Sequence, residues 1–182
     1  MIIVDTDVIL HSLRGASTLL IGSGGRPAGP ARAKMTSFWK EVFSSSKASV
    51  IPEVFNELHE GKDKLGRELV DFILNNARDV ILTPTSRYYE ALKRVGEWIR
   101  RHYGVEEWEE FERKADPHLV AHAVAIDGAI VLTHETAAPP QIHGKGPRIQ
   151  GTPRIPFVAY HFGVRTCRLY ELLIEAKANG IL

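Results

Sequence analysis

The chain begins with Met1-Ile2-Ile3-Val4-Asp5-Thr6-Asp7-Val8-Ile9-Leu10, and this stretch decides the fold. Its apolar start predicts a short buried strand that ends at Asp5, after which an apolar pattern with helical spacing resumes at Val8. Open α/β sheets bind their ligands beyond the carboxyl ends of the strands. A buried carboxylate is costly unless it is paired or holds a metal, so Asp5 and Asp7 are candidates for a site. The alternative is that one of them caps the helix that follows.

Composition limits the classes of protein to which the chain can belong. With 182 residues, 44% hydrophobic and 25% charged, it fits one globular domain over residues 1–182. A net charge of +1 excludes an overall basic field that would attract nucleic acid. The single cysteine, Cys167, excludes an internal disulfide, and we expect it to be buried in a strand. No apolar run is long enough for a membrane span, so we expect a cytoplasmic protein without membrane contact.

Strand-like and helix-like segments alternate along the chain. After the first strand, we expect strands at residues 48–51, 79–83, 129–133 and 164–168. Expected helices lie between and after them, at residues 8–15, 31–44, 52–60, 63–77, 84–103, 105–114, 116–126, 156–162 and 170–179. This alternation predicts an α/β fold, a three-layer α/β/α sandwich around a mostly parallel sheet. Two Gly/Pro-rich segments, near residues 16–32 and 137–153, are predicted to be flexible loops.

Residues 84–114 are rich in charge and in aromatic side chains. The basic residues Arg87, Lys93, Arg94, Arg100 and Arg101 alternate with Tyr88, Tyr89, Trp98 and Tyr103. Such a segment either contacts nucleic acid through phosphates and stacked bases, or is an ordinary solvated helix surface. His118 and His122, four residues apart, could face a zinc ion, but the Glu of the metalloprotease motif is missing.

Four acids occupy related positions in the expected fold: Asp5, Glu57, Asp116 and Glu135. Asp5 and Glu135 follow strands, and the ends of parallel strands open on one edge of a sheet, so we expect the acids to converge there. Carboxylates are the ligands of hard cations such as Mg²⁺ or Mn²⁺, which can activate a water molecule and stabilise charge on a phosphate. Each acid also has an ordinary explanation. Asp116 fits a helix cap, Glu57 could be a surface residue replaced by Glu53, and Glu135 could belong to a loop.

Four segments resemble a known family: IIVDTDVILHSLRG (2–15), IPEVFNELHEG (51–61), ADPHLVAHAVAIDGAIVLTHET (115–136) and IPFVAYHFGVRTCRLYELL (155–173). They are similar to the PIN-domain nucleases, especially the VapC-type toxin ribonucleases, and still more similar to a PIN-like group of unknown function. The resemblance implies an α/β/α sandwich, dependence on Mg²⁺ or Mn²⁺, and endonucleolytic cleavage of RNA. It also implies a homodimer and, for a toxin, an antitoxin protein that blocks the site.

The resemblance also assigns roles to individual residues. Asp5, Glu57 and Asp116 match the first three metal-binding acids of the family. Glu135 stands where a fourth Asp is common, and its longer side chain is expected to shift the metal or bind it less tightly. Asp7 stands where Asn is common and adds a further negative charge.

Two other functions remain open from the sequence. The Asp5-Thr6-Asp7-Val8 segment also resembles the first motif of haloacid-dehalogenase-like phosphohydrolases, in which Asp5 would be a covalent nucleophile and Asp7 a general acid. The strand at 129–133 is followed by His134-Glu135 instead of the paired acids that this mechanism uses. A catalytically weak RNA-binding module is the other alternative, if Glu135 weakens the metal site.

Overall fold

The computed structural model describes residues 1–14, 29–61, 64–136 and 149–178. They contain a four-stranded, all-parallel sheet with the order β2-β1-β3-β4. The strands are short: β1 (Ile2–Val4), β2 (Ala48–Ser49), β3 (Ile130–Leu132) and β4 (Arg165–Cys167). β1 lies inside the sheet, with Ile3 opposite Ser49 on one side and opposite Val131 on the other.

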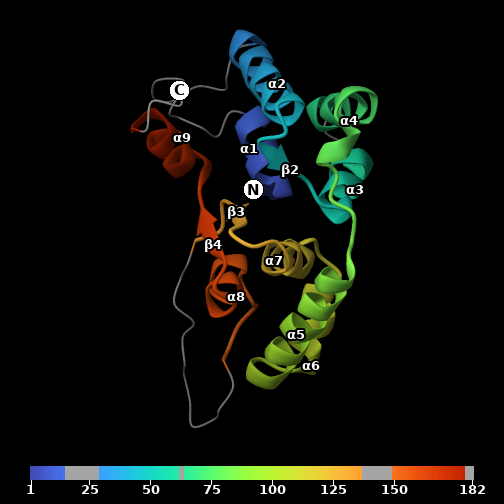
Figure 1. Cartoon of the computed structure of the whole chain (residues 1–182), viewed down its shortest axis with the longest axis vertical. Helices are drawn as coiled ribbons and strands as arrows, with labels where there is room; N and C mark the ends of the chain where they lie inside the picture. The colour runs from blue at the N-terminus through green and yellow to red at the C-terminus, as the bar shows by residue number, and fades with distance from the viewer. Residues whose placement is uncertain (15–28, 62–63, 137–148, 179–182) are drawn as a thin grey trace.

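Helices connect and flank these strands, which lie in the middle of the molecule (Figure 1). They are α1 (Thr6–Arg14), α2 (Gly29–Ser44), α3 (Pro52–Glu60), α4 (Lys64–Asn76), α5 (Ser86–His102), α6 (Val105–Glu112), α7 (Asp116–Ala125), α8 (Ile155–His161) and α9 (Leu169–Ala178). The parallel sheet with helices around it confirms the predicted α/β/α class. Within the described residues, no helix combines the length and apolarity that crossing a membrane requires.

The predicted strand at residues 79–83 is wrong. Arg78–Val80 forms a short 3₁₀ helix, η1, and the chain joins the sheet only through one bridge between Val50 and Ile81. β2 ends at Ser49 and α3 begins at Pro52, so the neighbouring strand has little extended backbone left to pair with. The N–H of Val50 donates to the carbonyl of Val80 at 3.0 Å, and the N–H of Leu82 donates to the carbonyl of Val50 at 2.9 Å. This pairing is too short to form a strand.

The two predicted loops lie largely outside the described residues. Residues 29–32 of the first belong to α2 instead. Of the second, residues 149–153 are described, and they form neither helix nor strand.

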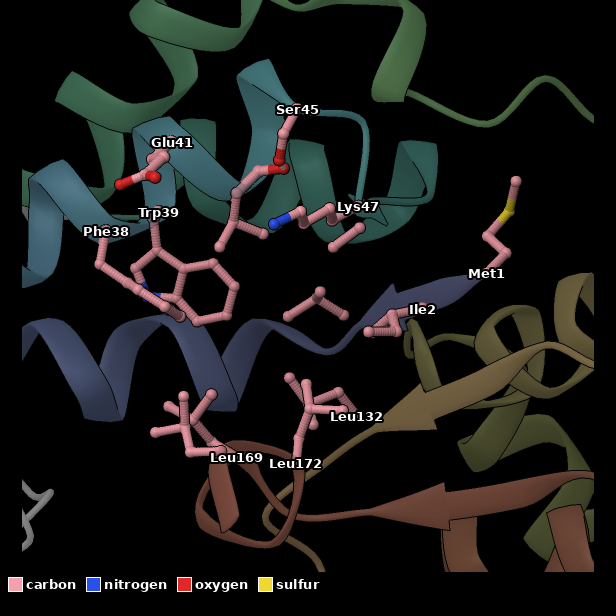
Figure 2. A pocket seen from close by; sticks show the side chains of 14 residues that line it. Met1, Ile2, Phe38, Trp39, Glu41, Ser45, Lys47, Leu132, Leu169 and Leu172 are labelled. Atoms are coloured by element: carbon pink, nitrogen blue, oxygen red, sulfur yellow. Dashed lines mark hydrogen bonds between the residues drawn. The ribbon is translucent and has the colours of Figure 1, made fainter. Parts of the chain in front are cut away.

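A cavity of about 400 Å³ lies between α2 and α9 on one face of the sheet. Figure 2 shows Trp39 of α2 and Leu169 of α9 lining it, together with Ile2 and Leu132 from the sheet. Its lining is mostly apolar and includes none of the candidate acids, so this cavity is separate from the predicted site. Cys167 is buried in β4, as predicted.

Gly96 allows α5 and α6 to pack closely. A Cβ atom at this position would lie 2.9 Å from Cζ2 of Trp108, whose side chain is buried. We expect Gly96→Ala to lower the free energy of unfolding by about 1–3 kcal/mol, because the indole has to shift within a packed core. Urea denaturation measures the change.

Gly66→Ala is the matched control, because it is also a helical glycine. Its added Cβ would lie 3.4 Å from Leu10 Cδ2, which is close to ordinary contact, and alanine favours the helix. We expect unchanged or slightly higher stability. Equal losses in the two variants would contradict the packing argument.

Candidate functional site

Asp5 directly follows β1 and is buried, with a relative exposure of 6%. Its N–H donates to the carbonyl of Leu132 at 3.0 Å, which extends the β1–β3 ladder by one bond. The hydroxyl of Thr133 donates to Asp5 Oδ2 at 2.9 Å. Burial raises the pKa of Asp5 to about 7, although the hydrogen bond from Thr133 lowers it. Burial therefore disfavours the charged form of this carboxyl, because the carboxylate loses contact with water.

Other carboxylates lie within electrostatic range of Asp5. The members of this group, which we call the acidic edge, are Asp5, Asp7, Glu57, Asp116 and Glu135. The negative charges of Asp116, Asp7 and Glu57 further raise the pKa of Asp5. Each of the four acids predicted from the sequence thus lies within electrostatic range of at least one of the others: Asp116 and Glu57 act on Asp5, and Glu135 acts on Asp116.

Asp116 is the first residue of α7. Burial raises its pKa to about 6, repulsion from Glu135 raises it further, and Lys114 lowers it. The interpretation of Asp116 as a helix cap is wrong. Ala115 occupies the cap position, with helical φ and ψ of −66° and −21°, and no side chain caps this end. Capping therefore does not account for a carboxylate at this position.

Glu57 lies on α3, and the hydroxyl of Thr6 donates a hydrogen bond to its Oε2. Glu53, one turn earlier, contacts a different group. Its Oε1 lies 3.4 Å from Nδ1 of His118, and the hydroxyl of Tyr88 is 2.7 Å from the same nitrogen. Of Glu53 and Glu57, it is Glu57 that belongs to the acidic edge.

Glu135 follows β3 and is engaged by the start of α8. The N–H of Ile155 donates to Glu135 Oε2 at 2.7 Å, and Nη1 of Arg154 lies 3.3 Å from Oε1. The N–H of Glu135 donates to the hydroxyl of Thr133 at 3.1 Å. Thr133 therefore connects Glu135 to Asp5 through one hydroxyl group.

The acidic edge fits a hard divalent cation in chemistry and in charge. Its donors are carboxylate and hydroxyl oxygens, and the raised pKa values of Asp5 and Asp116 mean that a nearby cation would relieve unfavourable charge. No three or more His, Cys, Asp or Glu side chains of the described residues are already arranged to hold a metal ion.

The aromatic side chains of residues 84–114 do not form a stacking surface. Tyr88 and Tyr103 are buried, and half-buried Trp98 stacks on His161 with ring centroids 4.4 Å apart. Tyr89 is the exception, with 62% exposure. The base-stacking alternative for this segment is therefore wrong for Tyr88 and Tyr103, whose rings are buried.

The pair His118 and His122 does not belong to a metal-binding group in the described residues. His118 contacts Tyr88 and Glu53, and His122 is buried. Burial, together with repulsion from His118, lowers the pKa of His122 to about 4. His122 is thus a neutral core histidine.

Two site residues were not identified from the sequence, Thr6 and Thr133. Each donates its hydroxyl hydrogen to an acid of the edge, Thr6 to Glu57 and Thr133 to Asp5. The sequence contains only a weak indication of their role. Both lie at strand ends beside the candidate acids, but spacing does not reveal the partner of a hydroxyl.

Comparison with known proteins gives one match. A family model described as "Domain of unknown function (DUF4411)" matches residues 31–179. No curated protein and no solved structure matches the chain.

The raised pKa values predict a pH-dependent stability. Because the pKa values of Asp5 and Asp116 lie above the usual 3.8, the folded protein binds more protons than the unfolded chain between about pH 4 and 7. Their contribution to the free energy of unfolding therefore falls as pH rises through this range, by a few kcal/mol at about 1.4 kcal/mol per unit. We expect Mg²⁺ or Mn²⁺ to restore stability at pH 7.5.

Urea denaturation at pH 4.5 and 7.5, with and without the cation, measures both effects. We expect Asp5→Asn to reduce the fall in stability and the gain from the cation, because the amide carries no charge. Asp71→Asn, an exposed acid on α4, is the control and should behave like the wild type. A wild-type response in Asp5→Asn would contradict the assignment.

Proposed function

The chain belongs to the family described as a domain of unknown function (DUF4411), and on its own residues we propose that it is a metal-dependent endoribonuclease. The proposed reaction is hydrolysis of RNA phosphodiester bonds at the acidic edge. Mg²⁺ or Mn²⁺ is the proposed cofactor, and Asp5, Glu57, Asp116 and Glu135 are the proposed ligands.

The pair of acids at the sheet edge, buried Asp5 and half-buried Asp116, is the observation that supports this proposal most strongly. Asp5 and Asp116 have pKa values raised to about 7 and 6 by burial, with further acids nearby. Proteins bury carboxylates in this way at functional sites, where a cation or a reaction uses the unfavourable charge. Several carboxylates placed near one another repel and destabilise the fold, so a purely structural role does not explain why they are there.

The residues of the chain have separable roles in this proposal. The hydroxyls of Thr133 and Thr6 each donate to one carboxylate oxygen, of Asp5 and of Glu57, and so orient these two side chains. Asp116 adds a third acid from the start of α7. A bound divalent cation would lower the pKa of a water molecule and offset charge on the phosphate.

RNA is proposed as the substrate because the four quoted segments resemble ribonucleases of the PIN-domain group. An antitoxin partner and a homodimer follow from the same resemblance and stay predictions. The phosphohydrolase alternative uses Asp5 in another way, as a covalent nucleophile, and the same variant can test it.

Cleavage of a mixed RNA pool tests the proposal. We expect cutting with Mg²⁺ or Mn²⁺, none with EDTA, and a loss on the order of a hundredfold or more in Asp5→Asn and Asp116→Asn, because each removes a charged ligand. Asp71→Asn controls for a loss of one negative charge elsewhere on the surface. A gel that resolves RNA fragments provides the measurement.

Three results would contradict the proposal. Cutting that persists in EDTA would exclude the metal. Absent RNA cleavage together with Asp5-dependent hydrolysis of a phosphomonoester would favour the phosphohydrolase. RNA binding without any hydrolysis would favour the binding module.

Thr133→Val tests the orienting role of the hydroxyl. The substitution keeps the side-chain shape but removes the hydrogen bond that lowers the pKa of Asp5, so this pKa rises. A hydrogen bond to a charged group contributes about 1.5–3 kcal/mol, so we expect the acid limb of the rate profile to move up by about one pH unit. Maximal activity should fall by about tenfold. Thr83→Val, at an exposed residue that is not a member of the acidic edge or a hydrogen-bond donor to it, should leave the profile unchanged.

A further inference from the structure

Arg154 stands at the rim of the acidic edge. It precedes α8, and Nη1 of its guanidinium lies 3.3 Å from Oε1 of Glu135. The Arg154 side chain is 60% exposed, whereas that of Glu135 is 19% exposed. The contact with Glu135 uses one of its terminal nitrogens, Nη1.

A continuous set of hydrogen bonds holds this guanidinium near the buried acid. Arg154 contacts Glu135, whose N–H donates to Thr133, and the Thr133 hydroxyl donates to Asp5. The N–H of Ile155 also donates to Glu135, at 2.7 Å, which anchors the backbone next to Arg154. The position of the arginine is therefore tied to the site and is not that of an unattached surface side chain.

Lys114 also acts on the acidic edge and, like Arg154, pairs with an acid. It lowers the pKa of Asp116, but its Nζ lies 3.6 Å from Glu110, one helical turn away. A lysine is also a point charge, whereas the planar guanidinium of arginine can donate two parallel hydrogen bonds to a phosphate.

We propose that Arg154 binds the phosphodiester group of the RNA substrate beside the acidic edge. This inference rests on the proposed function, because it assigns a substrate contact to the same site. A polyanion that approaches several carboxylates is repelled unless cations meet it, and a guanidinium at the rim supplies one such charge together with directional donors. An exposed ion pair alone adds little stability, so the pairing with Glu135 serves mainly to hold the arginine in place.

Binding of a fluorescein-labelled single-stranded RNA to the full chain tests the inference. Fluorescence anisotropy is measured in Ca²⁺ over a range of salt concentrations, and a gel checks that the probe stays intact. We expect Arg154→Ala to weaken binding about tenfold and to reduce the slope of log Kd against log salt by about 0.7, the value for one phosphate contact on a single strand. Arg154→Lys should recover part of the affinity and the full slope, because it keeps the charge.

Arg101→Ala is the matched control. Arg101 is an exposed arginine near the carboxyl end of α5, whereas Tyr88 at the other end of that helix contacts α7 beside the acidic edge. Its affinity and salt slope should match those of the wild type. Thermal unfolding of each variant separates loss of binding from loss of the fold.

The outcomes separate this inference from the proposed function. RNA binding that depends on Arg154, without cleavage by the wild type, would support the phosphate contact and overturn the nuclease. Cleavage by Arg154→Ala with unchanged KM and salt slope would overturn the phosphate contact and leave the nuclease standing. A raised KM with little change in kcat would support both, since the arginine would then contribute to binding. An absence of both binding and cleavage in the wild type would overturn both.

Discussion

The buried carboxyl of Asp5 is the constraint on which the site depends. β1 is hydrogen-bonded to a neighbouring strand on each side, so the residue that follows it is held in line with the sheet. The bond from its N–H to Leu132 extends this pairing by one residue, and Thr133, the next residue on that strand, supplies the donor for its side chain. Sheet register therefore fixes both the acid and its hydrogen-bond partner, and neither can move independently of the core.

The acidic edge is unfavourable to the folded chain on its own, and the apolar sheet beneath it offsets the cost. Ile3 and Val4, directly before Asp5, and Val131 in the neighbouring strand are fully buried, so the strands stay paired although acids follow them. A cation that binds only the folded protein adds stability in proportion to the logarithm of its concentration over Kd. The repulsion that destabilises the folded chain would therefore also favour binding of the proposed divalent cation.

The sequence was sufficient where one local signal decides the structure. The helix at 52–60 and the strand at 129–133 have strong periodicity or a continuous apolar run, and both were predicted to within one residue. The segment 79–83 has a similar apolar run, but a strand also needs a partner of sufficient length, which depends on tertiary structure. An Asp followed by Pro matches the pattern of a helix cap, but the sequence does not show that the preceding residue, Ala115, is the one that takes the cap position. The partner of Thr133 lies 128 residues away in the chain, so no local pattern could reveal it.

The structure offers a physical reason for a glutamate at position 135, where the resembled family commonly has an aspartate. Its carboxylate reaches the N–H of Ile155 at 2.7 Å and the guanidinium of Arg154 at 3.3 Å, both across the start of another helix. An aspartate is one methylene shorter, so it would keep its charge at the edge but lose this reach. The charge of Glu135 acts on two residues: it raises the pKa of Asp116, and it forms an ion pair with Arg154. A single carboxylate thereby couples the acidic edge to a basic group, the combination that a phosphate and its cation require.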